Sequence, residues 1–266
     1  MCGIVAILLQ PQARPEQVWA ELRATFTANL VANAVRGRAA TGLGVIQRSG
    51  QALVHKLAVE AEKFVETGGY HDVLDTVNAE TVVILGHTRL PTQGSPLNPH
   101  NNHPLTVGPV VGVHNGHIAN DDEVFARRAL PRIAQVDSEI IFQLLARHSP
   151  DSAAGDYLSL IGQDLTQLRG PCTFLAVDRR RPQRLLAFKH ENPLCLHYHA
   201  EWRALFFSSE YLFLRRTFGR SVATEELAND QLTYFDATQL PDLRGQPIAR
   251  HFPLPAQPPR AGSLLE

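Results

Sequence analysis

The chain opens with Met1-Cys2-Gly3-Ile4-Val5-Ala6-Ile7, and this stretch decides how the rest is interpreted. Removal of Met1 would make Cys2 the N-terminal residue, with its thiol beside a free α-amino group. A thiol attacks well only as a thiolate, and an α-amino group with an ordinary pKa of about 8 can accept its proton near neutral pH. The alternative is that Cys2 is a small apolar residue at the head of the buried strand that residues 4–9 predict.

Composition limits the class of protein. The 266 residues are 44% apolar, enough for one large domain or two small ones with a buried core. Lys and Arg total 25 against 26 Asp and Glu, so no overall charge attracts nucleic acid or an anionic membrane, and we expect neither as a partner. Cys2, Cys172 and Cys195 lie far apart, which argues against a zinc knuckle and a disulfide framework and favours a cytoplasmic protein. Residues 4–9 are too short for a signal peptide or a membrane span.

The pattern of apolar residues predicts the order of helices and strands. Helical spacing of apolar residues predicts a long amphipathic helix over residues 15–36, which includes Val35 in its apolar face. Further helices are predicted from about residue 138, over 157–168 and over 211–217. Short β-prone runs predict strands at residues 42–47, 53–57, 82–88, 110–114, 173–177, 184–188, 194–198 and 204–208.

This order favours two sheets with helices outside them, an α+β fold. A doubly wound parallel sheet is not expected, because strands and helices do not alternate regularly behind a Gly-rich first turn. After about residue 236 the character changes, since six of the 18 prolines fall in the last 31 residues. We therefore expect one domain over residues 2–235 and a Pro-rich C-terminal extension over 236–266.

Besides Cys2, four segments carry residue types suited to catalysis. They are Arg36-Gly37-Arg38-Ala39-Ala40-Thr41-Gly42, Gly86-His87-Thr88-Arg89-Leu90-Pro91-Thr92-Gln93-Gly94, His114-Asn115-Gly116 and Val136-Asp137-Ser138-Glu139. In this order, behind an N-terminal Cys-Gly-Ile, they resemble the class II glutamine amidotransferases, which are N-terminal-nucleophile hydrolases. The resemblance is to the glutaminase domain of glucosamine-6-phosphate synthase, and it spans nearly the whole chain.

The resemblance implies a fold and a reaction. The fold would have four αββα layers, with two stacked, mainly antiparallel sheets. The reaction would be hydrolysis of L-glutamine to glutamate and ammonia through a γ-glutamyl thioester on Cys2, without a metal or an organic cofactor. The ammonia would pass to a synthase, which we expect as a separate subunit because the chain ends about where such a domain would begin. The acceptor of the ammonia is left open.

The substrate glutamine has a carboxylate, an ammonium and an amide, and each needs a partner. The planar guanidinium of Arg89 suits a carboxylate, and the resemblance assigns it the α-carboxylate, with Thr92 close by. Asp137 corresponds to the aspartate that holds the α-ammonium, although an aspartate before a helix is also a preferred N-cap.

Attack on the amide places negative charge on its oxygen, so hydrogen-bond donors are needed there. The resemblance assigns this oxyanion hole to the side chain of Asn115 and the backbone N–H of Gly116, while a bare Asn-Gly is more often a hairpin turn. Arg36, Gly37 and His114 are expected in supporting roles. For Arg36 and Gly37 the alternative is a helix end with a C-cap glycine.

The chain also departs from the resemblance. Leu90-Pro91-Thr92-Gln93 stands where the synthases have Trp-Ala-Thr-His, and Ala39-Ala40 replaces Asp-Ser. The first change affects a loop that closes over glutamine in the family. The sequence does not decide how closure of this loop is coupled to a second active site.

Three rival interpretations remain. A metal site could use His100, His103, His114 and His117, but the spacing of the last two does not suit a helical His pair and no carboxylate completes a ligand frame. A catalytically inactive module could bind only glutamine or a partner protein. An amidohydrolase of the same class could act on another γ-glutamyl compound.

Overall fold

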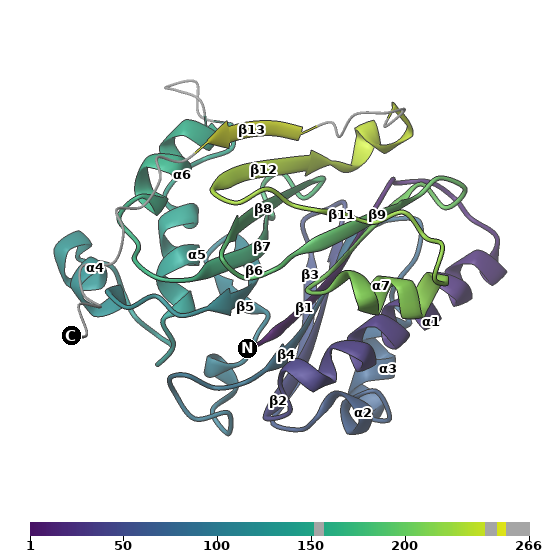
Figure 1. The fold of residues 1–266 in the computed structure, drawn as a ribbon, viewed down its shortest axis with the longest axis horizontal. Coiled ribbons are helices and arrows are strands. Elements are labelled where there is room, and N and C mark those ends of the chain that lie inside the picture. The colour runs from purple at the N-terminus through teal and green to yellow at the C-terminus, as the bar shows by residue number, and fades with distance from the viewer. Residues whose placement is uncertain (152–156, 243–248, 254–266) are drawn as a thin grey trace, which may run out of the picture.

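The computed structural model describes residues 1–151, 157–242 and 249–253. Two β-sheets lie face to face, and helices cover the outer face of each sheet (Figure 1). Every strand pair in the described residues is antiparallel. The predicted fold class, with two stacked antiparallel sheets between helices, is therefore confirmed.

The first sheet contains the N-terminal strand near its centre. It has seven strands in the order β11 (Glu225–Glu226), β9 (Cys195–His199), β10 (Ala204–Ser208), β1 (Gly3–Leu9), β4 (Thr81–Arg89), β2 (Ala40–Gln47) and β3 (Ala52–Leu57). The second sheet has six, in the order β13 (Ala249–Pro253), β12 (Gln231–Asp236), β8 (Arg184–His190), β7 (Cys172–Asp178), β6 (Val110–Gly116) and β5 (Leu105–Val107).

The helices divide between the two outer faces (Figure 1). The first sheet is covered by α1 (Glu16–Ala32), α2 (Ala61–Phe64), α3 (Gly68–Leu74) and α7 (Tyr211–Phe218). The second is covered by α4 (Asp121–Arg128), α5 (Ser138–Ala146) and α6 (Tyr157–Leu165). Short 3₁₀ turns lie at Asn33–Arg36, Pro99–Asn101 and Ala237–Asp242. Among the described residues, no helix combines the length and the apolar character that crossing a membrane requires.

Strand β1 explains why the opening of the chain is continuously apolar. Ile4, Ala6 and Leu8 pack between the two sheets, whereas Val5 and Ile7 pack against the outer helices. Successive side chains of a strand point to opposite faces, so a strand buried on both faces needs apolar residues at every position. Cys2 directly precedes this strand, so it lies at one end of the core that the two sheets share.

The helix predicted over residues 15–36 was wrong at its end. The α-helix stops at Ala32, and Asn33–Arg36 form a 3₁₀ turn. A 3₁₀ turn has about three residues per turn, so the apolar face is not continued, and Val35 is 66% exposed. The change from α-helix to 3₁₀ turn instead directs Arg36 toward the N-terminal residues.

The C-terminal part of the described chain belongs to the second sheet. Strand β12 spans residue 235, where we placed the end of the domain, and β13 pairs with β12 inside the segment we expected as an extension. The boundary at residue 235 remains a prediction. Most of residues 243–266 lie outside the described residues.

Candidate active site

Cys2 and Arg89 are neighbours because of the register of two central strands. Gly3 of β1 pairs with Thr88 of β4 in antiparallel fashion, so the residues just outside this pair lie side by side. The Cys2 Sγ atom is 3.4 Å from the Leu90 backbone nitrogen, which donates to it, and 3.5 Å from the Leu90 carbonyl oxygen. Burial raises the pKa of the Cys2 thiol, while the Leu90 N–H and the charge of Arg89 act in the opposite direction. The thiol therefore needs a base to become a nucleophile.

A narrow pocket of about 20 Å³ opens beside Cys2. Its walls come from the ends of β1, β4 and β6, the loop after β4 and the start of α5. They are formed by Cys2, Arg89, Leu90, Thr92, Gln93, His103, His114, Gly116, Val136, Asp137 and Ser138. The pocket thus brings together the nucleophile candidate and most of the residues that the sequence assigned to the substrate.

Arg89 is a buried cation, 3% exposed, at the end of β4. Its Nη1 atom donates to Asn102 Oδ1 at 2.7 Å, and Nη2 donates to the carbonyl oxygens of Gly94, at 2.8 Å, and of Gln93. Burial lowers the pKa of Arg89, and the nearby Asp137 opposes this shift. Among the described residues no carboxylate forms an ion pair with Arg89. Its hydrogen bonds within the described residues go to neutral oxygens, which a carboxylate could replace with a stronger, charge-assisted contact.

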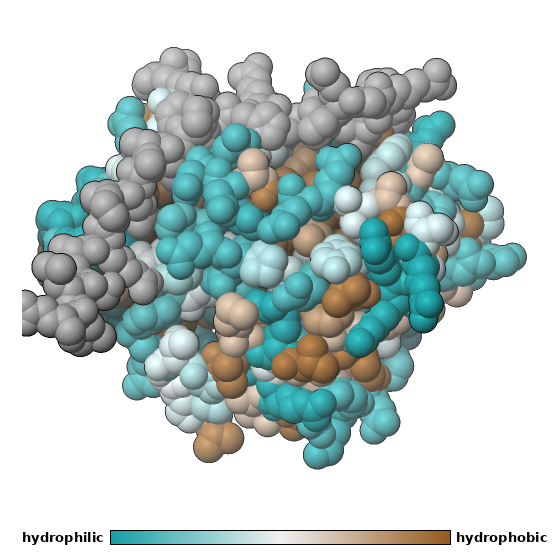
Figure 2. All heavy atoms as spheres, viewed as in Figure 1, coloured by the Kyte–Doolittle hydropathy of each residue, from teal (hydrophilic) through white to brown (hydrophobic). Residues whose placement is uncertain are grey.

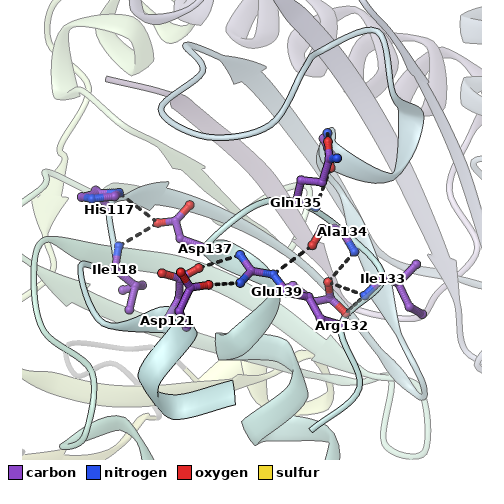
Figure 3. A network of polar contacts seen from close by, with 11 residues as sticks. His117, Ile118, Asp121, Arg132, Ile133, Ala134, Gln135, Asp137 and Glu139 are labelled. Carbon is purple, nitrogen blue, oxygen red and sulfur yellow. Dashed lines mark hydrogen bonds and ion pairs between the residues drawn. The ribbon is translucent and has the colours of Figure 1, made fainter. Parts of the chain in front are cut away.

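Asp137 precedes α5 but does not cap it. Its backbone is helical, and its side chain makes no capping hydrogen bond. Instead Oδ2 accepts a hydrogen bond of 2.7 Å from Ile118 N and lies 3.7 Å from His117 Nδ1 (Figure 3). Asp137 therefore stands at the N-cap position of α5 without a side-chain capping bond there, and it lines the pocket.

The segment before Asp137 is anchored by charged groups (Figure 3). Glu139, which is buried, accepts hydrogen bonds from Ile133 N at 3.0 Å and Ala134 N at 2.6 Å. Arg132 pairs with Asp121 of α4 at 2.7 Å. These contacts hold the chain on both sides of Asp137 and so fix the position of its carboxylate.

The end of β6 presents His114, Asn115 and Gly116. The Asn115 carbonyl accepts a hydrogen bond from Asn192 Nδ2 at 3.0 Å. The side-chain nitrogen of Asn115 is buried, and no described residue is its hydrogen-bond partner. Gly116 has φ +157°, and a Cβ there would lie 2.0 Å from Pro171 O. Only glycine fits this close approach. His114 Nδ1 is 2.8 Å from Ser138 Oγ, which links β6 to α5.

Arg36 and Gly37 support the N-terminal region. Arg36 Nε donates to the Cys2 carbonyl at 2.9 Å, and its Nη1 forms an ion pair with Glu210. A Cβ on Gly37 would lie 2.3 Å from the carbonyl carbon of Arg89. Gly37 is also the C-cap of the 3₁₀ turn, as the helix-end alternative expects, while a supporting role in catalysis remains a prediction.

Comparison with known proteins identifies the relatives of this chain. Glutamine–fructose-6-phosphate aminotransferase of Yersinia pseudotuberculosis is 28% identical over 206 residues, which are 74% of this chain and 30% of that protein. The enzyme of the same name from Corynebacterium efficiens is 32% identical over 178 residues, 63% of this chain and 27% of that protein. Glutamine phosphoribosylpyrophosphate amidotransferase from B. subtilis superposes with a TM-score of 0.66 at 16% identity over 88% of this chain and 47% of its own. No protein-family model matches the chain.

In sequence this chain is similar to glutamine–fructose-6-phosphate aminotransferases, and in fold to a glutamine amidotransferase. The predicted resemblance is thereby confirmed, and the kinship supports an enzyme of this class. The chain spans less than a third of the first of these sequence relatives. The likeness to the solved structure shows the fold.

Sequence reasoning did not assign two residues of this candidate site to substrate binding or catalysis. His103 lines the pocket, and its ring contacts that of His87 in a tilted arrangement with centroids 4.3 Å apart. Neither ring nitrogen of His103 has a hydrogen-bond partner among the described residues. Asn102 holds the guanidinium of Arg89. The sequence marks His103 only as a candidate metal ligand. Within the described part of the chain, no group of three or more His, Cys, Asp or Glu is arranged to hold a metal ion. The Asn-His-Pro run before a strand was the available signal.

Proposed function

We propose that this amidotransferase relative hydrolyses L-glutamine to glutamate and ammonia, with Cys2 as nucleophile. One observation carries the proposal: a buried arginine without a carboxylate partner, a buried aspartate and a cysteine line a single pocket. Arg89 binds the α-carboxylate and Asp137 the α-ammonium, which directs the side-chain amide toward Cys2. A free α-amino acid is the ligand that satisfies both charges at once.

The base for Cys2 is its own α-amino group after Met1 has been removed. The imidazoles near the pocket are poor candidates, because burial lowers the pKa of His87 to about 3 and that of His103 well below its usual value. Burial lowers the pKa of His114 as well. Such imidazoles are neutral and weakly basic at pH 7.

The reaction then proceeds in two steps. The Cys2 sulfur attacks the amide carbon, its proton passes to the α-amine, and the tetrahedral oxyanion accepts hydrogen bonds from Asn115 Nδ2 and Gly116 N–H. The amine returns the proton to the leaving nitrogen, which departs as ammonia and leaves a γ-glutamyl thioester. Water then attacks the thioester, and its addition releases glutamate and restores the thiol. The unpartnered amide of Asn115 supports this role, since a buried donor without a partner is costly unless a ligand uses it.

The loop after β4 opens to admit the substrate. A volume of about 20 Å³ holds a water molecule or two but not an amino acid. The Gln93 and Gly94 carbonyls occupy Nη2 of Arg89, so these oxygens stand where a substrate carboxylate can bind. Exchange of the two neutral acceptors for one carboxylate strengthens the contacts of the buried guanidinium.

Replacing Arg89 by lysine is expected to raise KM for glutamine about 10- to 100-fold with a smaller change in kcat. Lysine keeps the charge but loses the planar pair of donors, so the loss falls on substrate binding. Steady-state glutamate release measures both constants. Arg38→Lys is the matched control, because the Arg38 side chain is 58% exposed and, among the described residues, pairs with Glu60 and Glu62. Equal effects in the two variants would contradict the role of Arg89.

Retention of Met1 is expected to leave glutamine binding intact and to lower hydrolysis strongly. The α-amine would then lie one residue too early to accept the Cys2 proton. Protein made with and without an inhibitor of methionine aminopeptidase can be compared by intact mass, glutamine binding and turnover. Full activity in protein whose mass includes Met1 would overturn the α-amine as base.

The ammonia passes to a synthase, which we propose as a separate subunit. The names of the relatives support transfer, because they denote attachment of the glutamine nitrogen to an acceptor. Affinity capture of the tagged protein from its native cell tests this point, and recovery of a synthase with the chain would support it. Comparing glutamine with γ-glutamyl amides in one assay separates glutaminase activity from hydrolysis of another γ-glutamyl compound.

A further inference from the structure

Lys56 on β3 is a partly buried lysine that contacts two backbone carbonyls. Its Nζ atom donates to Asn102 O at 2.7 Å and to Pro104 O at 3.0 Å. Among the described residues no carboxylate forms an ion pair with it. Burial lowers the pKa of Lys56 to about 8. A partly buried cation that forms no ion pair within the described residues costs free energy, which the two carbonyls only partly offset.

The two carbonyls bracket the part of the loop that forms the wall of the pocket. Between them lies His103, whose ring lines the pocket. Asn102 is 2% exposed, and its side chain makes two hydrogen bonds. Oδ1 accepts from Arg89 Nη1 at 2.7 Å, and Nδ2 donates to Pro96 O at 2.7 Å. A continuous set of hydrogen bonds therefore runs from Lys56 through Asn102 to Arg89.

Resting on the proposed hydrolysis of glutamine, we propose that Lys56 is a positioning residue for the substrate carboxylate. It fixes the backbone of Asn102, and Asn102 in turn orients the guanidinium of Arg89. Lys56 touches no reacting atom, so its contribution is to hold the carboxylate site in the geometry that binds glutamine.

The surroundings of Lys56 make a specific test possible. A pocket of about 320 Å³, separate from that of Cys2, is lined by Lys56 together with His100 and Glu139 and the apolar residues Val54, Leu105 and Ile133. Truncation of Lys56 to alanine extends this space toward the two carbonyls. A small alkylammonium ion can then enter and donate to them in place of the lost side chain.

The experiment measures glutamine binding by calorimetry in a Cys2→Ala background, where no turnover or aminolysis can occur. Adding Lys56→Ala is expected to weaken binding about tenfold. Ethylammonium is expected to restore most of the affinity, whereas tetramethylammonium, which has no N–H group, is not. Lys56→Arg should keep more affinity than Lys56→Ala. Lys63→Ala is the matched control, since the Lys63 side chain is 71% exposed on α2, and it should bind as tightly as its parent.

Each outcome decides the inference. Unchanged affinity in a folded Lys56→Ala protein, checked by thermal unfolding, would overturn it, as would equal restoration by the two ammonium ions. If Lys56→Ala does not fold, Lys56→Gln provides the measurement, with a several-fold loss expected and no loss overturning the inference. Failure of the Cys2→Ala parent to bind glutamine would overturn the proposed function as well. If the Cys2→Ala parent binds glutamine and the added Lys56→Ala change does not weaken that binding, this inference alone is overturned.

Discussion

Replacing Cys2 by alanine is expected to lower glutamine hydrolysis by about 10⁴-fold or more, to the background rate. Alanine removes the sulfur atom that we propose forms the thioester, and it should leave the rest of the pocket unchanged. Glutamine should still bind, because Arg89 and Asp137 are retained. Glutamate release measures the loss, and mass spectrometry of acid-quenched wild-type protein should detect a γ-glutamyl adduct that the variant lacks.

A second cysteine provides the control. Cys195 on β9 is buried, and burial raises its pKa to about 11, so its thiol is inert at neutral pH. Cys195→Ala should keep most of the activity, with any loss traceable to stability. Substantial hydrolysis by Cys2→Ala would exclude Cys2 as the nucleophile. Glutamine binding without hydrolysis in the wild type would favour the inactive-module interpretation.

Replacing Asn115 by alanine is expected to lower kcat about 100- to 1,000-fold, with little change in KM. The side-chain donor acts on charge that develops only during attack, so its loss falls on the transition state. Its nitrogen has no hydrogen-bond partner in the free protein, so no existing contact of that nitrogen is broken. Steady-state kinetics together with thermal unfolding separate catalysis from stability.

Asn192 serves as the comparator for Asn115. Its side chain donates to the Asn115 carbonyl and therefore holds the same strand end without supplying a donor to the oxyanion. Asn192→Ala should reduce kcat far less than Asn115→Ala. Similar losses in both variants would indicate that strand geometry, and not a donor at the oxyanion, explains the result.

Much of the fold was predictable because its strands are buried and short. The apolar run at residues 4–9 and the β-prone segment at residues 82–88 became the central strands β1 and β4, which are buried on both faces. Elements without a strong apolar pattern were missed. Helix α4 is largely polar, yet Asp121, Asp122 and Glu123 in its first turn and Arg127 and Arg128 in its last are the charge order that stabilises a helix.

The candidate site, too, was predictable from the sequence only in part. Short motifs identified Cys2, Arg89, Gly116 and Asp137, and the structure brings all four to one pocket. The sequence could not distinguish a capping aspartate from one that faces a ligand, because both precede a helix. Asp137 accepts a hydrogen bond from the Ile118 N–H, and the packing of β6 against α5 sets the position of that group.

By itself, the sequence determined the class of fold and the identity of the chemical groups, because buried strands need apolar residues and a charged substrate needs charged partners. Only the tertiary structure decided how those groups are held. Lys56 lies on β3 and Arg89 on β4, and β2 pairs with both strands. Asn102, in the loop before β5, joins the two side chains through hydrogen bonds. Gly37 is required for a similar reason, since the Arg89–Leu90 peptide passes where its side chain would lie. Contacts between strands depend on register and on close approach, and neither is written in any local stretch of residues.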